Sequence, residues 1–140
     1  MKIKRNPIVS IQLSLRFAKE YLDALCEMRK SHTEAEIQTS KTLTIIHRAL
    51  WTSLIIEVGR LFDTHKTKEV ISLKNLKLPK VKKDINRIHG ETIVGKIIDT
   101  RKTFTAHWDK EGNDITSVTE ICNSKLGKLL YELNELLIKN

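Results

Sequence analysis

An arginine and a histidine stand six positions apart in the stretch DTRKTFTAHWDK, near the end of an apolar-periodic segment. If the side chains of Arg101 and His107 converge, they can cleave RNA without a metal ion. Histidine titrates near neutral pH and can move protons in a transition state. A guanidinium can hold the scissile phosphate through two parallel hydrogen bonds and offset the charge that builds on it. The pair is therefore a candidate site for RNA cleavage.

The spacing alone is weak evidence for such a site. If four to six residues are allowed between the arginine and the histidine, roughly 0.75 matches are expected by chance in a chain of this composition. Two are present, Arg101–His107 and Arg60–His65. On a straight helix the first pair points about 120° apart, so the helix must end or bend between them, or a second chain must complete the site. In the ordinary alternative, Arg101 is a solvated arginine and His107 is favoured by the helix dipole.

Basic residues outnumber acidic ones, with 25 Lys and Arg against 17 Asp and Glu. Part of the excess forms a lysine strip that only Glu69 opposes: Lys66, Lys68, Lys74, Lys77, Lys80, Lys82 and Lys83. Such a strip favours a polyanionic partner such as RNA. The alternative is a solvated loop whose lysines only aid solubility.

Several other function classes find no support in the sequence. There is no glycine-rich phosphate loop, and no two histidines have the helical spacing of metal ligands, so we expect no metal and no other cofactor. No apolar run reaches the roughly 18 residues of a membrane span, and the basic N-terminus lacks the apolar core of a signal peptide. Cys26 and Cys122 have no ligand spacing and are predicted to be buried free thiols in a reducing cytosol. We therefore expect a cytoplasmic protein without membrane attachment.

The elements that would position the Arg–His pair are helices. Apolar residues recur at spacings of three and four along most of the chain, and no strand signal is longer than a few residues. Ser31 and Glu34 have the spacing of a capping box, and Thr39 and Ser40 could equally cap a later start of the same helix. We expect an all-α bundle in one domain, 1–140, with four main helices: Asn6 to about Arg29, a start between Ser31 and Ser40 to near Asp63, Val81 to Phe104, and a start at Asp114 or Ser117 toward the C-terminus.

The first helix carries apolar residues beyond its core-facing stripe. Val9, Leu13, Phe17 and Tyr21 lie to one side of that stripe. So wide an apolar surface fits either a central helix of the core or a second contact, such as a dimer interface.

The chain resembles the HEPN superfamily in three segments, WTSLIIEVGRLFD, ISLKNL and RKTFTAHWD. Within that superfamily, it most resembles the branch of abortive-infection proteins of the U type. The resemblance covers about Leu43–Asp109, and the R-x5-H piece falls within the R-x4-6-H range of the family. It implies a four- to five-helix up-and-down bundle, HEPN-like, that forms a homodimer. It also implies that Arg101 and His107 are the catalytic pair and that the dimer brings both copies into one cleft.

The activity that the resemblance implies is that of a metal-independent endoribonuclease in a phage-defence or toxin–antitoxin system, with a cognate antitoxin as a partner. The RNA 2′-OH would attack its neighbouring phosphate. One His107 would take the proton and the other would protonate the leaving 5′-oxygen, while Arg101 of each chain holds the phosphate. A cyclic phosphate end would result.

Five further residues are predicted to support this site. Trp108 and Asp109 follow the histidine directly, and Lys102 follows the arginine, where many catalytic members carry Asn, Asp or His. Arg60 and Asp63 are three apart on one helix face and are predicted to form an ion pair that orders the bundle beside the site.

Two other classes of function stay open at the level of the sequence. The first is a non-catalytic HEPN-like module that binds RNA or a partner protein through the bundle and the lysine strip. The second is a purely helical interaction subunit.

Overall fold

The computed structural model describes residues 6–64, 72–106 and 117–139. Within these ranges the structure consists of helices and contains no strand, so the predicted all-α class is confirmed. The helices are α1 (Pro7–Ser31), α2 (Glu34–Thr39), α3 (Lys41–Leu61), α4 (Lys82–His89), α5 (Thr92–Ala106), α6 (Val118–Asn123) and α7 (Leu126–Lys139).

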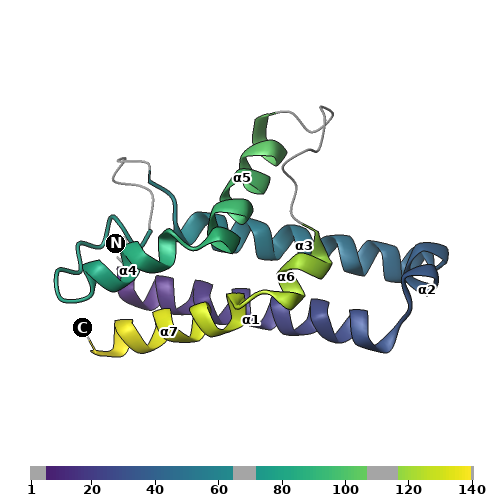
Figure 1. Ribbon diagram of the computed structural model, residues 1–140, viewed down its shortest axis with the longest axis horizontal. Coiled ribbons are helices and arrows are strands. Elements are labelled where there is room, and N and C mark those ends of the chain that lie inside the picture. The colour runs from purple at the N-terminus through teal and green to yellow at the C-terminus, as the bar shows by residue number, and fades with distance from the viewer. Residues whose placement is uncertain (1–5, 65–71, 107–116, 140) are drawn as a thin grey trace, which may run out of the picture.

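The long axis of the molecule is formed by α1, α3 and α7 (Figure 1). In this view α1 packs against both α3 and α7, which run in the opposite direction to it. The helix α5 packs on α3 but rises away from it, and α4 lies toward the end where α7 finishes. The candidate arginine is therefore carried by the helix that crosses α3.

The hydrophobic core joins all the long helices. Leu25 of α1, Leu54 of α3 and Ile97 of α5 are fully buried, and Leu133 of α7 is nearly so. Burying one such side chain contributes about 1.5–3 kcal/mol of transfer free energy. Ile88 of α4 belongs to the same cluster, so that short helix is also anchored to the common core.

The first helix begins as its sequence predicts. The side chain of Asn6 accepts a hydrogen bond from the N–H of Ile8 at 3.0 Å, and Pro7 is the first helical residue. The predicted apolar stripe faces the core, while Val9, Leu13 and Phe17 are exposed and Tyr21 is half-buried beside Phe17. The second apolar face of α1 is thus confirmed as a surface feature, and its use in a dimer stays a prediction.

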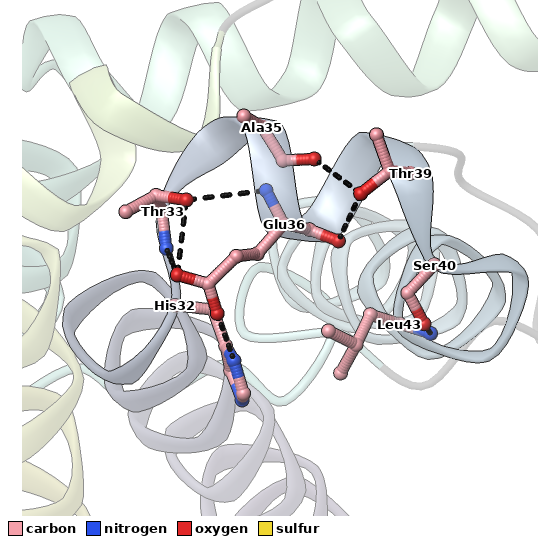
Figure 2. Close-up of polar contacts among 7 residues, drawn as sticks. All are labelled: His32, Thr33, Ala35, Glu36, Thr39, Ser40 and Leu43. Carbon is pink, nitrogen blue, oxygen red and sulfur yellow. Dashed lines mark hydrogen bonds and ion pairs between the residues drawn. The ribbon is translucent and has the colours of Figure 1, made fainter.

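Figure 2 shows the corner at which α1 ends and the next two helices begin. The Thr33 hydroxyl accepts from the N–H of Glu36 at 3.1 Å, and Oε1 of Glu36 accepts from the N–H of Thr33 at 3.3 Å. The hydrogen bond from the Thr33 backbone, with those from the side chains of His32 and Thr33, lowers the pKa of Glu36. Ser40 caps α3 by accepting from the N–H of Leu43 at 3.2 Å. The Ser40 cap is confirmed, but the capping box is Thr33–Glu36 and the Ser31–Glu34 alternative is wrong.

The continuous helix predicted from Val81 to Phe104 is wrong, because α4 and α5 are separate. Gly90 ends α4, and the N–H of Glu91 donates to the carbonyl of Ile88 at 3.0 Å, which closes a tight turn. Glycine costs about 1 kcal/mol in a helix interior relative to alanine, which favours a break there. The last predicted helix is divided as well. Ser117 caps α6, and Ser124 then accepts from the N–H of Leu126 at 3.2 Å to start α7.

The prediction of two free thiols is wrong. Cys26 on α1 and Cys122 on α6 form a disulfide, with their Cα atoms 5.6 Å apart. That separation falls in the ordinary range for a disulfide. The bond ties α6 to α1 across 96 positions of sequence. Among the described helices, none is both long and apolar enough to cross a bilayer.

Candidate active site

Arg101 reaches from α5 to the end of α3. Its Nη1 lies 3.4 Å from Oδ2 of Asp63, which stands two residues beyond the last residue of α3. The side chain of Arg101 is 29% exposed and that of Asp63 is 17% exposed, so the pair is partly shielded from water. The contact is longer than the roughly 2.7–2.9 Å of a strong charge-assisted hydrogen bond. Asp63 therefore orients the guanidinium through a weak ion pair.

Gly59 provides the surface on which Arg101 lies. A methyl group added at Gly59 would stand 2.2 Å from Cδ of Arg101 and 3.2 Å from its Cβ and Cγ. Side-chain atoms do not approach so closely, so the arginine stem lies against the bare backbone of α3. This glycine directly precedes Arg60 in the segment EVGRLFD, and sequence reasoning did not select it.

Arg101 lines a cavity of about 440 Å³, which lies between the ends of α3 and α4 and the face of α5. Among the described residues, its lining includes the cationic side chains of Arg101 and Lys102 and the carboxylate of Asp63. Phe62 and Ile98 supply apolar walls. An excess of positive charge in a partly shielded hollow suits a phosphate.

A histidine missed by sequence reasoning lines the same cavity. His89 is the last residue of α4, and its ring lies 5.3 Å from that of Phe62. Burial lowers the pKa of His89, and the positive charge of Lys74 lowers it further. The local signal in the sequence is Gly90, which directly follows His89 and is a residue type disfavoured in a helix interior.

The ion pair predicted between Arg60 and Asp63 is not formed in the described part of the chain. Arg60 pairs with Glu57, three residues earlier on α3, and its Nη2 donates to the Ser14 hydroxyl of α1 at 2.7 Å. Arg60 thus ties α3 to α1, while Asp63 serves Arg101 instead. The prediction was wrong because α3 ends at Leu61, so Asp63 leaves the helix face that Arg60 occupies.

Five lysines of the predicted strip are described, and all five are exposed: Lys74, Lys77, Lys80, Lys82 and Lys83. They run along the connector before α4 and into its first turn. The charge of Lys74 acts on His89, which lines the cavity, so the strip is electrostatically coupled to it. The predicted residues Lys66, Lys68, His107, Trp108 and Asp109 lie outside the described residues.

A second and larger hollow, of about 670 Å³, lies elsewhere in the fold. It is lined from the end of α1, from α2 and α3 and from the start of α6, and it includes Arg29, His47 and Trp51. It shares no lining residue with the Arg101 cavity. Within the described ranges, no three His, Cys, Asp or Glu side chains gather as potential metal ligands.

A helical bundle is the fold that the resemblance to HEPN domains implies. The comparison with known families agrees, because the model of the HEPN family AbiU2 matches residues 10–136. The match spans nearly the whole chain and includes every helix at least in part. The protein belongs to the AbiU2 family, an abortive-infection branch of the HEPN superfamily. No curated protein and no solved structure matches the chain.

Proposed function

We propose that this protein is a metal-independent endoribonuclease of a phage-defence or toxin–antitoxin system, which cleaves RNA with Arg101 and His107 from both subunits of a homodimer. The observation that carries the proposal is the seating of Arg101. Gly59 and Asp63 fix this arginine at the mouth of a cationic cavity, in a chain of the AbiU2 family. The cytoplasm is the expected location, and a cognate antitoxin protein is the expected control.

The geometry of Arg101 supports a role in binding phosphate. A guanidinium carries five N–H donors in a planar fork, a geometry that matches the oxygens of a phosphate. The 3.4 Å contact is long enough for an incoming phosphate to compete for the guanidinium. Lys102 lines the same cavity and adds charge that opposes the build-up on the scissile phosphate.

In the proposed reaction, the 2′-oxygen bonds to phosphorus as the bond from phosphorus to the 5′-oxygen breaks. The 2′-hydroxyl gives up its proton and the leaving 5′-oxygen gains one, so the proton count balances. His107 moves these protons, and Arg101 stabilises the pentavalent phosphate. The products are a 2′,3′-cyclic phosphate and a free 5′-hydroxyl. The exposed apolar face of α1, with Val9, Leu13 and Phe17, is the surface that we assign to the dimer.

The test compares RNA cleavage and cell toxicity of the wild type with those of Arg101→Ala and His107→Ala. Each variant should lose about 10²- to 10⁴-fold in cleavage rate, the usual worth of a proton-transfer or charge-stabilising group. Arg16→Ala is the matched control, because Arg16 is a well-exposed arginine of α1 whose recorded partner is Glu20. Cleavage should continue in EDTA. Equal activity in the wild type and both site variants overturns the proposal.

The second candidate is a HEPN-like module that binds RNA without cutting it. The exposure of all five described lysines from Lys74 to Lys83, and the action of the Lys74 charge on His89, favour this reading. RNA that is bound and recovered intact, with binding weakened by Lys80→Glu and unaffected by His107→Ala, would establish the binding module in place of the nuclease.

A further inference from the structure

His89, at the end of α4, lines the cavity that Arg101 also lines. The helix stops at His89, the chain turns at Gly90, and α5 then leads to Arg101. His89 and Arg101 line one hollow of about 440 Å³, although they come from opposite sides of the helix break. The ring of His89 is held by its contact with Phe62, whose side chain is 4% exposed. The imidazole therefore packs against a buried aromatic ring.

The charged groups around His89 are mostly cations. Lys74 from the connector acts on it, and Arg101 and Lys102 from α5 share its cavity, with Asp63 beyond the end of α3 as the acidic lining residue. Partial burial lowers the pKa of His89, and the positive charge of Lys74 lowers it further, so both disfavour its protonated form. At neutral pH the ring then carries one N–H donor and one unprotonated nitrogen acceptor.

The cations and the neutral imidazole of the cavity suit different groups of an RNA chain. For a phosphate, the cavity offers Arg101 and Lys102 as cationic partners. A neutral imidazole suits a hydroxyl, which can donate to the unprotonated nitrogen. Within an RNA chain, the sugar–phosphate backbone offers a single type of hydroxyl, the ribose 2′-OH, and that group is what distinguishes RNA from DNA.

We propose that His89 is a second RNA-contacting histidine of this cleft, and that its ring accepts a hydrogen bond from the ribose 2′-hydroxyl beside the phosphate held by Arg101. The inference rests on the proposed function for the identity of the polymer. It assigns to His89 the selection of RNA over DNA, and it does not require that His89 transfer a proton.

The experiment measures binding, so that it does not depend on cleavage. The full chain with His107→Ala is titrated in EDTA with mixed-sequence RNA and with mixed-sequence DNA, each about 12 nucleotides long, a length within the range of single-stranded sites. Fluorescence anisotropy gives both affinities. The protein should prefer RNA by about fivefold, the worth of one hydrogen bond between neutral groups.

Replacing the imidazole should then remove the preference. His89→Phe keeps an aromatic ring against Phe62 but has no acceptor, so its affinity for RNA should fall to its affinity for DNA. The affinity for DNA should change by less than about twofold. His32→Phe is the matched control, because His32 lies at the α1–α2 corner with Glu36 as its partner. His89→Gln, which retains a carbonyl acceptor, guards against a packing defect and should keep part of the preference.

Acidification provides an independent arm of the test. Below the pKa of His89 the ring has two donors, one added charge and no acceptor, so affinity for both polymers should rise while the preference for RNA falls. The preference should stay flat with pH in His89→Phe. A loss of RNA and DNA affinity in equal proportion, or a preference for RNA that survives in His89→Phe, overturns the assignment. A wild type that binds RNA through His89 but does not cut it would overturn only the nuclease.

Discussion

Replacing Gly59 by alanine should separate the stability of this protein from the function of its cleft. Gly59 is near the end of α3, and alanine is favoured over glycine within a helix by about 1 kcal/mol. The new methyl group would stand 2.2 Å from Cδ of Arg101, so the arginine must leave its seat. Its ion pair with Asp63 is lost with it.

The two effects on stability nearly cancel. The Arg101–Asp63 pair is long and partly exposed, so breaking it should cost no more than about 1 kcal/mol. That cost offsets the gain in helix propensity, and the melting temperature should move by less than about 4 °C. Catalysis has no such compensation, because moving a phosphate-binding group by about 1 Å can cost about 100-fold in rate. RNA cleavage should therefore fall by about that factor while the protein stays folded.

A second glycine in the chain offers the control. Gly95 lies in α5, and a methyl group added there meets no atom within 4 Å. Gly95→Ala should stabilise the protein by up to about 1 kcal/mol and leave cleavage unchanged. The measurements are thermal unfolding followed by circular dichroism and cleavage of a labelled RNA. A Gly59→Ala protein with wild-type cleavage would refute the idea that the bare backbone of α3 seats the arginine.

Three further outcomes follow from the structure. Cys122→Ser opens a covalent loop of 96 positions and should lower the free energy of unfolding in urea by up to about 4–5 kcal/mol, and a reductant should then have no further effect on the variant. Lys74→Glu should weaken RNA binding and make a plot of the logarithm of the binding constant against the logarithm of salt concentration less steep, by about 0.7 for each lost phosphate contact. Lys30→Glu, at the far end of α1, should leave the slope of that plot unchanged. Burial, together with the charge of Arg29, lowers the pKa of His47 below its ordinary 6.5. As pH falls, His47 therefore takes up a proton in the unfolded chain before it does so in the folded protein. The free energy of unfolding should decline below about pH 7, and this decline should be smaller in His47→Gln.

The helices with regular stripes and local caps could be predicted from the sequence. The burial of Ile11, Leu15 and Leu25 on one face of α1 follows from a spacing of three and four, and the Asn6 cap is read from adjacent residues. The break at Gly90 could not be seen in the same way. Ile88 and Ile93 each face the core. The five-residue step between them looks like a gradual shift of the apolar stripe around one helix, and not like the start of a second helix.

Contacts between residues of different helices could not be predicted from the local sequence pattern. Arg60 has an acidic residue three positions away on either side, and the sequence alone gives no reason to prefer Glu57 over Asp63. The choice depends on where α3 ends, because a residue past the helix end no longer shares its face. The disulfide failed to be predicted for a related reason, since 96 positions separate its cysteines and only the packing of α6 on α1 brings them together.

The features that build the candidate site are those that interrupt the helical period. Asp63 lies just past the end of α3, and His89 lies at the last position of α4, so both side chains leave helix faces that would otherwise direct them into the core or along the surface. Gly59 removes a side chain where α5 must approach α3. Arg101 occupies an ordinary position within α5, and it becomes a site residue because Gly59, Asp63 and His89 meet beside it. The Arg–His spacing identifies the arginine, whereas the breaks around it determine what that arginine faces.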